Sequence, residues 1–289
     1  MLLAALGFSI MGGFAKSLKG SFNAGQLVFF RNAIGLLVLV AGFILKPPAS
    51  KGGKLYLLIF RGLMGTIALY TLMYCILHLP LGTAMTYSLT SAIFIAIFSF
   101  LLYREFHGIG ILLAVLLGFS GMLLIYKPAM HFPWYYHAVG LLSGITSALA
   151  YITLGRLAVY YNPRIIVLSF VLTGVLVPVI FMLIKYFANI SSDNVFFIDW
   201  QWPQGIQWLY LLLLGLSALF GQYFVTRAYS ADKAGIVSAI GYANIIFSVF
   251  IGMMLGDAFP DWMSSLGILC IISCGIIISV VKQRGKIVA

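Results

Sequence analysis

Charged side chains are scarce in this sequence. Only 8% of its 289 residues are Asp, Glu, Lys or Arg, whereas 63% are hydrophobic. A water-soluble domain of ordinary composition carries about 25% charged residues. Because so few charges cannot cover the surface of a soluble fold, the composition predicts a protein whose surface faces lipid.

Acidic residues are the rarest charged group, and each is predicted to lie in a loop or at the end of an apolar stretch. They are Glu105, Asp193, Asp199, Asp232, Asp257 and Asp261. The mid-membrane carboxylate of many ion-coupled pumps is therefore not expected. The phosphate-binding pattern G-x-x-x-x-G-K-[S/T] is also missing, which argues against direct use of ATP. These absences predict a uniporter or an exchanger, with coupling through a tyrosine or a substrate proton left open.

Other classes of site are also missing. The three cysteines lie in apolar stretches without nearby His or acid, so we expect no disulfide, no metal site and no cofactor. The motifs H-E-x-x-H and G-x-S-x-G are absent, so an enzyme is not expected. The net charge of +11 is spread thinly between apolar stretches. This distribution is unlike a nucleic-acid-binding patch, so we expect no nucleic-acid partner.

Long apolar runs fill almost the whole chain. A helix needs about 20 apolar residues to cross the hydrocarbon core of a bilayer. The sequence predicts an all-α membrane protein with ten transmembrane helices: Met1–Leu18, Gln26–Leu45, Leu55–Leu77, Thr83–Tyr103, Gly108–Tyr126, Tyr136–Val159, Ile165–Phe187, Gln207–Tyr229, Gly235–Leu255 and Trp262–Val281.

The basic residues predict how these helices are oriented, because cytoplasmic loops of membrane proteins are enriched in Lys and Arg. With the N-terminus inside, twelve fall on the cytoplasmic side: Lys46, Lys51, Lys54, Arg61, Arg104, Arg156, Arg164, Arg227, Lys233, Lys282, Arg284 and Lys286. Four fall on the other side: Lys16, Lys19, Lys127 and Lys185. We therefore expect a multi-pass protein of the inner (cytoplasmic) membrane with both termini cytoplasmic.

An internal repeat is suggested by identical residues at a constant offset. The pairs are Gly62 and Gly215, Tyr70 and Tyr223, Gly82 and Gly235, Phe94 and Phe247, and Leu102 and Leu255. The predicted domains are residues 1–127 and 136–282, joined by a loop at 128–135. Each half would hold five helices, an odd number, so the second half would be inverted. Two five-helix inverted repeats are an architecture of secondary transporters, with the substrate site between the halves.

Several short motifs resemble the drug/metabolite transporter superfamily, in its ten-helix EamA-type branch. They are Phe29-Phe30-Arg31, Arg61-Gly62, Leu79-Pro80-Leu81, Tyr103-Arg104-Glu105, Thr226-Arg227-Ala228-Tyr229 and Gly256-Asp257-Ala258-Phe259-Pro260. The resemblance covers essentially the whole chain. It implies a carrier of amino acids, nucleotides, sulfonium cofactors, vitamins or related small molecules. The chain departs from the pattern at Ser91-Ala92, where a proline is common, and at Asp257, where Glu is usual.

Arg31 is the most informative single residue because a charge inside the membrane is expensive unless it pairs or meets water. It lies about six residues, or roughly 9 Å, into the second predicted helix. One interpretation is structural, with the guanidinium snorkelling or bound to backbone carbonyls. The other is a cavity arginine that binds an anionic group of the substrate. Arg61 is expected instead to anchor the third helix at the cytoplasmic interface.

Other polar and aromatic residues fall within the predicted helices, where they should point inward. Together with Arg31 the candidate substrate-binding residues are Tyr70, Tyr74, Tyr87, Ser88, Ser91, Tyr151, Gln222, Tyr242 and Asn244. Hydrogen bonding between helices is the alternative role for each. Tyr87 and Ser91 in one half lie at depths comparable to Tyr242 and Asn244 in the other, which favours a shared cavity.

Two functions remain open at this point. The first is a carrier, monomeric or homodimeric and surrounded by membrane lipid, that moves a small polar metabolite by alternating access. The second is a lipid flippase or scaffold subunit, which would have the same helices without a closed polar cavity. Neither the substrate nor the direction of transport follows from the sequence.

Overall fold

The computed structural model describes residues 1–49, 51–79, 81–103, 109–126, 133–188, 200–232 and 234–257, with short pieces between 261 and 277. These residues form α-helices and their connections, and no strand occurs among them. The helices are α1 (Leu2–Ser17), α2 (Ala24–Leu45), α3 (Leu55–His78), α4 (Leu81–Leu89), α5 (Ser91–Tyr103), α6 (Ile109–Tyr126), α7 (Trp134–Leu157), α8 (Pro163–Ala188), α9 (Gln207–Ala231), α10 (Ala234–Ile240) and α11 (Ala243–Met254).

Among the described residues, six stretches are long and apolar enough to cross a membrane. They are Ala24–Leu45, Leu55–His78, Trp134–Leu157, Pro163–Phe187, Gln207–Ala231 and Ile236–Met254. Many of their large apolar side chains point away from the protein; Ile44, for example, is 77% exposed and Leu37 is 72% exposed. Exposed apolar surface of this extent fits contact with lipid and not with water. The all-α membrane class is therefore confirmed.

Two predicted helices are interrupted. The predicted Thr83–Tyr103 becomes α4 and α5, which meet at Thr90, and the predicted Gly235–Leu255 becomes α10 and α11, which meet at Gly241 and Tyr242. The hydroxyl of Thr90 donates to the carbonyl of Tyr87 at 2.6 Å and competes with the helix hydrogen bonds. The predicted tenth helix, Trp262–Val281, and the connecting loop 128–135 fall largely outside the described residues.

Local sequence explains where several helices begin. The side chain of Asn23 accepts a hydrogen bond from the backbone N–H of Gln26 at 2.9 Å and so caps α2. Asn162 accepts one from the N–H of Arg164 at 3.0 Å, and Pro163 opens α8, where its missing N–H has no consequence. Capping fixes the start of both helices and hence the depth of the side chains that follow.

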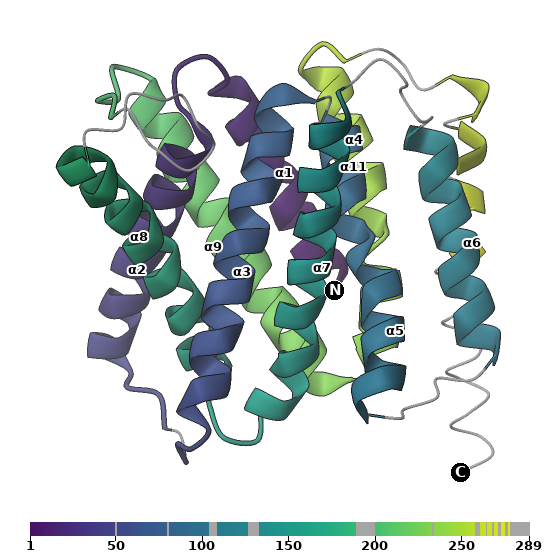
Figure 1. Cartoon of the computed structure of the whole chain (residues 1–289), viewed down its shortest axis with the longest axis horizontal. Coiled ribbons are helices and arrows are strands. Elements are labelled where there is room, and N and C mark those ends of the chain that lie inside the picture. The colour runs from purple at the N-terminus through teal and green to yellow at the C-terminus, as the bar shows by residue number, and fades with distance from the viewer. Residues whose placement is uncertain are drawn as a thin grey trace.

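The helices stand side by side as an upright bundle, with α6 at one edge (Figure 1). α1 packs against α9 and α11, and α3 packs against α7 and α8. α2 packs against α8 and α9. α4 and α5 both pack against α7; α4 also packs against α11, and α5 against α10. This arrangement leaves the centre of the bundle surrounded by helices from both halves of the chain.

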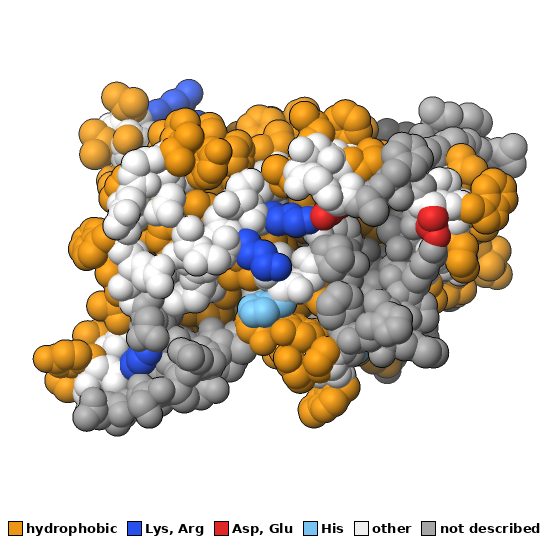
Figure 2. All heavy atoms as spheres, turned by 90° about the horizontal axis from the view of Figure 1, so that it is seen from above, with side chains coloured by type: hydrophobic (Ala, Val, Ile, Leu, Met, Phe, Trp, Pro, Cys, Tyr) orange, Lys and Arg blue, Asp and Glu red, His pale blue; other side chains and the backbone are white. Residues whose placement is uncertain are grey.

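The two ends of the bundle differ in their contacts. At one end the α2–α3 connection meets the α7–α8 connection, since the N–H groups of Lys51 and Gly52 both donate to the carbonyl of Tyr160 at 3.1 Å. At the other end Lys16, in the last turn of α1, forms an ion pair with Asp257, just after α11. Seen from that end, a few charged and histidine side chains gather near the middle while apolar side chains form much of the rim (Figure 2).

Gly7 allows α1 and α9 to approach closely. A Cβ atom at this position would lie 2.9 Å from the backbone nitrogen of Gly221 and 3.0 Å from its Cα atom. Because backbone atoms cannot move aside as side chains can, we expect Gly7→Ala to push the helices apart. The expected destabilisation is about 1–3 kcal/mol, the usual cost of overpacking, and it should appear as a lower melting temperature of the purified protein.

Gly42 in α2 provides the matched control, because a Cβ there would meet nothing within 4 Å. Gly42→Ala is expected to leave the melting temperature unchanged or raise it, since alanine is the better helix former by about 1 kcal/mol. Equal melting temperatures for the two variants would contradict the close approach of α1 and α9.

Candidate substrate cavity

A cavity lies at the centre of the bundle and draws residues from both halves of the chain. Its lining comprises Ala5, Phe8, Met11, Arg31, Arg61, Gly65, Ala68, Leu69, Leu72, Met85, Ser88, Leu89, Ser91, Ser147, Ala150, Tyr151, Phe170, Gln222, Tyr229, Ser238 and Asn244. The space open to the centres of water molecules is about 80 Å³, several times the roughly 10–15 Å³ that a cavity needs to hold one water.

Arg31 faces this cavity from α2 and is 4% exposed. Its Nε donates to the sulfur of Met11 at 3.2 Å, and its Nη1 donates to Oδ1 of Asn32 at 3.1 Å. Its guanidinium carbon lies 5.3 Å from the centroid of the Phe170 ring. All these partners are neutral, so the charge of Arg31 is oriented by the protein but not compensated by it.

Arg61 lies elsewhere than expected. It was predicted to sit at the membrane interface, but it is 1% exposed and lines the cavity. Its Nε and Nη1 atoms are buried and have no hydrogen-bond partner among the described residues. Its guanidinium carbon lies 5.1 Å from the centroid of the Phe170 ring and 6.0 Å from that of Tyr151. The prediction failed because α3 begins at Leu55, which puts Arg61 roughly 9 Å along the helix, on the side facing α7 and α8.

Gly65 makes the position of Arg61 possible. A Cβ atom at Gly65 would clash with Nη1 of Arg61 and would lie 2.7 Å from Cδ2 of Phe170. Residues four apart share one face of a helix. The spacing of Arg61 and Gly65 was therefore a signal in the sequence that the arginine could lie against a glycine surface inside the bundle.

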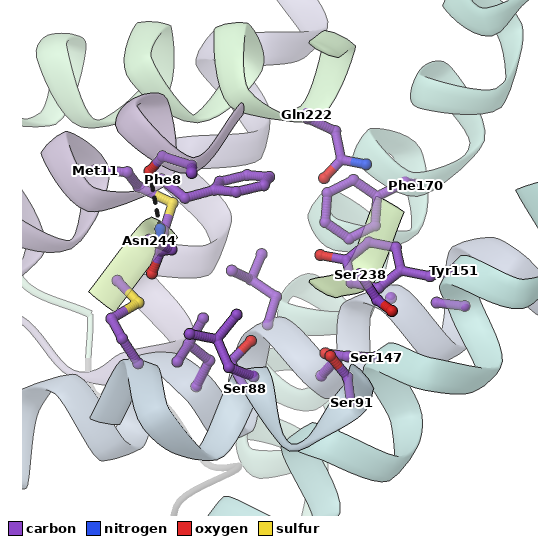
Figure 3. A pocket seen from close by; sticks show the side chains of 18 of the residues that line it. Phe8, Met11, Ser88, Ser91, Ser147, Tyr151, Phe170, Gln222, Ser238 and Asn244 are labelled. Carbon is purple, nitrogen blue, oxygen red and sulfur yellow. Dashed lines mark hydrogen bonds between the residues drawn. The ribbon is translucent and has the colours of Figure 1, made fainter. Parts of the chain in front are cut away.

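Six of the ten candidate residues meet at the cavity: Arg31, Ser88, Ser91, Tyr151, Gln222 and Asn244. In Figure 3 the hydroxyls of Ser91, Ser147, Tyr151 and Ser238 gather on one side, and the amide of Gln222 lies above Phe170. The Nε2 atom of Gln222 is buried and makes no hydrogen bond. These groups present mainly neutral hydrogen-bonding atoms to the cavity.

The four other candidates lie outside the lining. Tyr70 is buried and packs edge-on against Phe181, and Tyr74 stacks on Tyr136 with ring centroids 5.8 Å apart. Tyr87 hydrogen-bonds Nδ1 of His137. Tyr242 packs beside Cys274, with its hydroxyl buried and without a partner. All four are at least partly buried, as predicted, but they point toward other helices.

Asn244 lines the cavity and also ties α11 to α1. Its Nδ2 donates to the carbonyl of Ala5 at 2.8 Å and to Oγ of Ser9 at 3.0 Å. The hydroxyl of Ser248 donates to Oδ1 of Asn244 at 3.3 Å. Because its polar atoms are used within the protein, Asn244 holds two helices together at the edge of the cavity.

No acidic side chain lines the cavity in the part of the chain that the structure describes. Asp257 is paired with Lys16 at one end of the bundle, and Asp232 follows α9. The prediction that acids lie outside the helices is therefore confirmed for these two residues.

Comparison with known proteins supports transport as the activity. A model of the EamA-like transporter family matches residues 1–127. An uncharacterized transporter of Helicobacter pylori (strain ATCC 700392 / 26695) is 32% identical over 99% of this chain and 96% of its own length. The pseudopaline exporter CntI of Pseudomonas aeruginosa (strain UCBPP-PA14) is 29% identical over 94% of this chain and 92% of its own length.

More distant relatives also match most of this chain. Solute carrier family 35 member G1 of Mus musculus is 25% identical over 94% of this chain and 74% of its own length. A solved structure titled "Crystal structure of protein" matches with a TM-score of 0.73 and 16% identity over 96% of both chains, which shows a shared fold. The chain is a multi-pass membrane protein that belongs to the EamA-like transporter family of the drug/metabolite transporter superfamily.

Proposed function

We propose that this protein is a secondary transporter that moves a small polar metabolite with an anionic group through its central cavity by alternating access. The observation that carries the proposal is Arg31, a buried cation that faces the cavity and whose hydrogen-bond partners in the described part of the chain are neutral. A buried charge is strongly unfavourable unless it is compensated. An anionic substrate supplies that compensation. A lipid flippase or scaffold subunit gives no reason for an uncompensated cation that faces an internal cavity.

The size of the cavity favours a compact substrate. A space of about 80 Å³ holds several waters, each of which needs at least roughly 10–15 Å³, and this favours an amino acid or another small acid as the substrate. The name of the Pseudomonas relative states that it exports pseudopaline. This is consistent with a small-molecule carrier here.

Ten helices in two inverted repeats are supported by the helix boundaries. α3 ends at His78 and α9 ends at Ala231, while α4 begins at Leu81 and α10 begins at Ala234. Both pairs have the offset of 153 seen in the sequence. The helix contacts show the same correspondence between the halves. α3 of the first half packs on α7 and α8 of the second half, and α9 of the second half packs on α1 and α2 of the first half. We therefore keep residues 1–127 and 136–282 as the two repeats.

A cytoplasmic location of both termini in the inner membrane is supported by the positions of the lysines. The connections that carry Lys51 and Arg164 lie together at one end of the bundle, where Arg164 Nη1 donates to the carbonyl of Lys46 at 3.5 Å. Lys16 lies at the opposite end. The end with the Lys46–Lys54 connection is the cytoplasmic one in this orientation.

A binding screen combined with a cavity-filling variant tests the proposal. A metabolite that binds only the folded protein should raise its melting temperature, by an amount equivalent to about 2.7 kcal/mol at one hundred times its Kd. Ser147 is 6% exposed and lines the cavity, so Ser147→Phe should fill the space and abolish the stabilisation. Uptake of the same metabolite into proteoliposomes should be lost with it.

Ser120 on α6 supplies the matched control, because its side chain is exposed and its hydroxyl bonds only within its own helix, to the carbonyl of Leu116. Ser120→Phe should keep both binding and uptake. Binding that survives in Ser147→Phe would place the site elsewhere. A library in which no metabolite binds or is carried would refute the proposed function.

A further inference from the structure

We propose that the substrate is a small dianion, with its two negative charges held between Arg31 and Arg61. The inference rests on the proposed function, because it names the class of substrate that the same cavity would carry. It goes beyond it in giving Arg61 a binding role and in setting the charge of the ligand. The two sources of such a ligand are a short dicarboxylate and a phosphate monoester.

The first argument is the state of Arg61. Its Nε and Nη1 atoms are buried and have no hydrogen-bond partner among the described residues. The whole side chain is only 1% exposed, so water does not supply the missing partners. The Phe170 and Tyr151 rings beneath the guanidinium cannot accept these N–H groups in their plane, and leaving buried donors of a charged group without an acceptor is strongly unfavourable. Packing alone does not explain it, because an apolar side chain would fill the same place without that penalty. An oxyanion in the cavity would satisfy these donors.

The second argument is the proximity of the two arginines. Their guanidinium carbons lie 5.3 and 5.1 Å from the centroid of the same Phe170 ring, so they can be no farther apart than the sum of these distances. Two like charges this close repel each other strongly away from bulk water. A ligand with a single negative charge would neutralise one arginine and leave the other uncompensated. Two negative charges neutralise both.

The third argument is the character of the remaining lining. In the described part of the chain it contains no carboxylate. The ammonium group of an amino acid would therefore find aromatic rings and neutral oxygens but no opposite charge, whereas an oxyanion would find two cations and several neutral donors. α5 begins at Ser91 and α11 begins at Ala243, so the positive ends of two helices also lie beside the cavity. A doubly negative ligand without an ammonium group fits this lining best.

The fourth argument is size. The cavity offers about 80 Å³ to the centres of water molecules, which is enough for several waters and favours a short ligand such as a four-carbon dicarboxylate. Its two carboxylates are close enough to reach two neighbouring guanidinium groups, each of which can hold an oxyanion by two parallel hydrogen bonds.

A ligand series tests the charge requirement on the unmodified protein. The probes are succinate and its monoamide succinamate, which have nearly the same shape and differ by one charge, and glycerol 3-phosphate with its singly charged methyl diester at pH 8. Dissociation constants come from melting-temperature titrations of the purified protein. We expect a dianion to bind at least tenfold tighter than its monoanionic partner in one of the two pairs. The pair that does so identifies the source of the charge.

Arg61→Gln locates the second charge. It should reduce the preference for the dianion to less than threefold, because one cation is left to be neutralised. Arg156→Gln is the matched control, since Arg156 is exposed at the end of α7, and it should keep the full preference. Should Arg61→Gln fail to fold, Arg61→Lys is the second variant. It keeps a positive charge at position 61, so it should retain the preference for the dianion at lower affinity.

Three outcomes separate this inference from the proposed function. Equal binding of dianion and monoanion in both pairs, or a tenfold preference that persists in Arg61→Gln, overturns the dianion and leaves the carrier intact. The same holds if none of the four probes binds while another metabolite binds in the cavity. Absence of any bound or transported metabolite overturns the proposed function as well.

Discussion

Arg31→Lys is expected to leave the protein folded and to weaken the binding of its anionic substrate by about 1.5–3 kcal/mol, or roughly 10- to 150-fold. The guanidinium of arginine is a planar fork that can hold a carboxylate or phosphate by two parallel hydrogen bonds, whereas the ammonium of lysine is a point charge. Met11 and Asn32 orient the guanidinium of Arg31 by accepting hydrogen bonds from it. The donors of lysine all lie on one nitrogen, so lysine cannot bind these two residues and also present a planar pair of N–H groups to the substrate.

The measurement needs the melting temperature and the dissociation constant on the same purified sample. Arg156→Lys serves as the control, because the same chemical change at an exposed position should alter neither quantity. If Arg31 only holds helices together, the melting temperature of Arg31→Lys will fall while affinity stays the same. That result would remove Arg31 from the site and with it the observation that carries the proposed function.

The positions of the helices along the chain could be predicted well from apolar runs. The predicted Leu55–Leu77 became α3 (Leu55–His78), and the predicted Gln207–Tyr229 became α9 (Gln207–Ala231). The break between α4 and α5 was missed. A continuous apolar run does not reveal a break, because it depends on one hydroxyl, that of Thr90, bonding the carbonyl of Tyr87.

The residues of the site were harder to predict, because hydropathy gives the depth of a side chain in the membrane but not the direction in which it points. Tyr70 and Tyr74 were expected to turn inward; they pack against Phe181 and Tyr136, on neighbouring helices. Arg61 was assigned to the interface from its nearness to a basic loop. Its direction is set by the contacts of α3 with α7 and α8, which are between segments far apart in the sequence.

Exchange is expected to be at least tenfold faster than net uptake, and this follows from the same two arginines. A carrier must pass through an occluded state whether it is loaded or empty. With substrate bound, the charges of Arg31 and Arg61 are compensated. When the cavity is empty, both cations must be enclosed with neutral partners only. Enclosing an uncompensated charge costs several kcal/mol, and each 1.4 kcal/mol slows a step about tenfold.

Counterflow in proteoliposomes measures this difference directly. Uptake of a radiolabelled substrate identified by the binding screen is compared between vesicles that contain the unlabelled substrate and vesicles that contain buffer alone, at equal pH on both sides and without chloride. The loaded vesicles should take up label at least tenfold faster, and a protonophore should leave that rate unchanged, because no acid lines the cavity among the described residues. Equal rates with and without internal substrate would contradict the role of the two cations. Uptake that requires an imposed proton gradient and is lost in Asp257→Asn would replace exchange by proton coupling.

Arg61→Gln sharpens the test, because this variant removes one of the two uncompensated charges. The empty carrier should then reorient faster, and the difference between the rates of exchange and net uptake should become smaller.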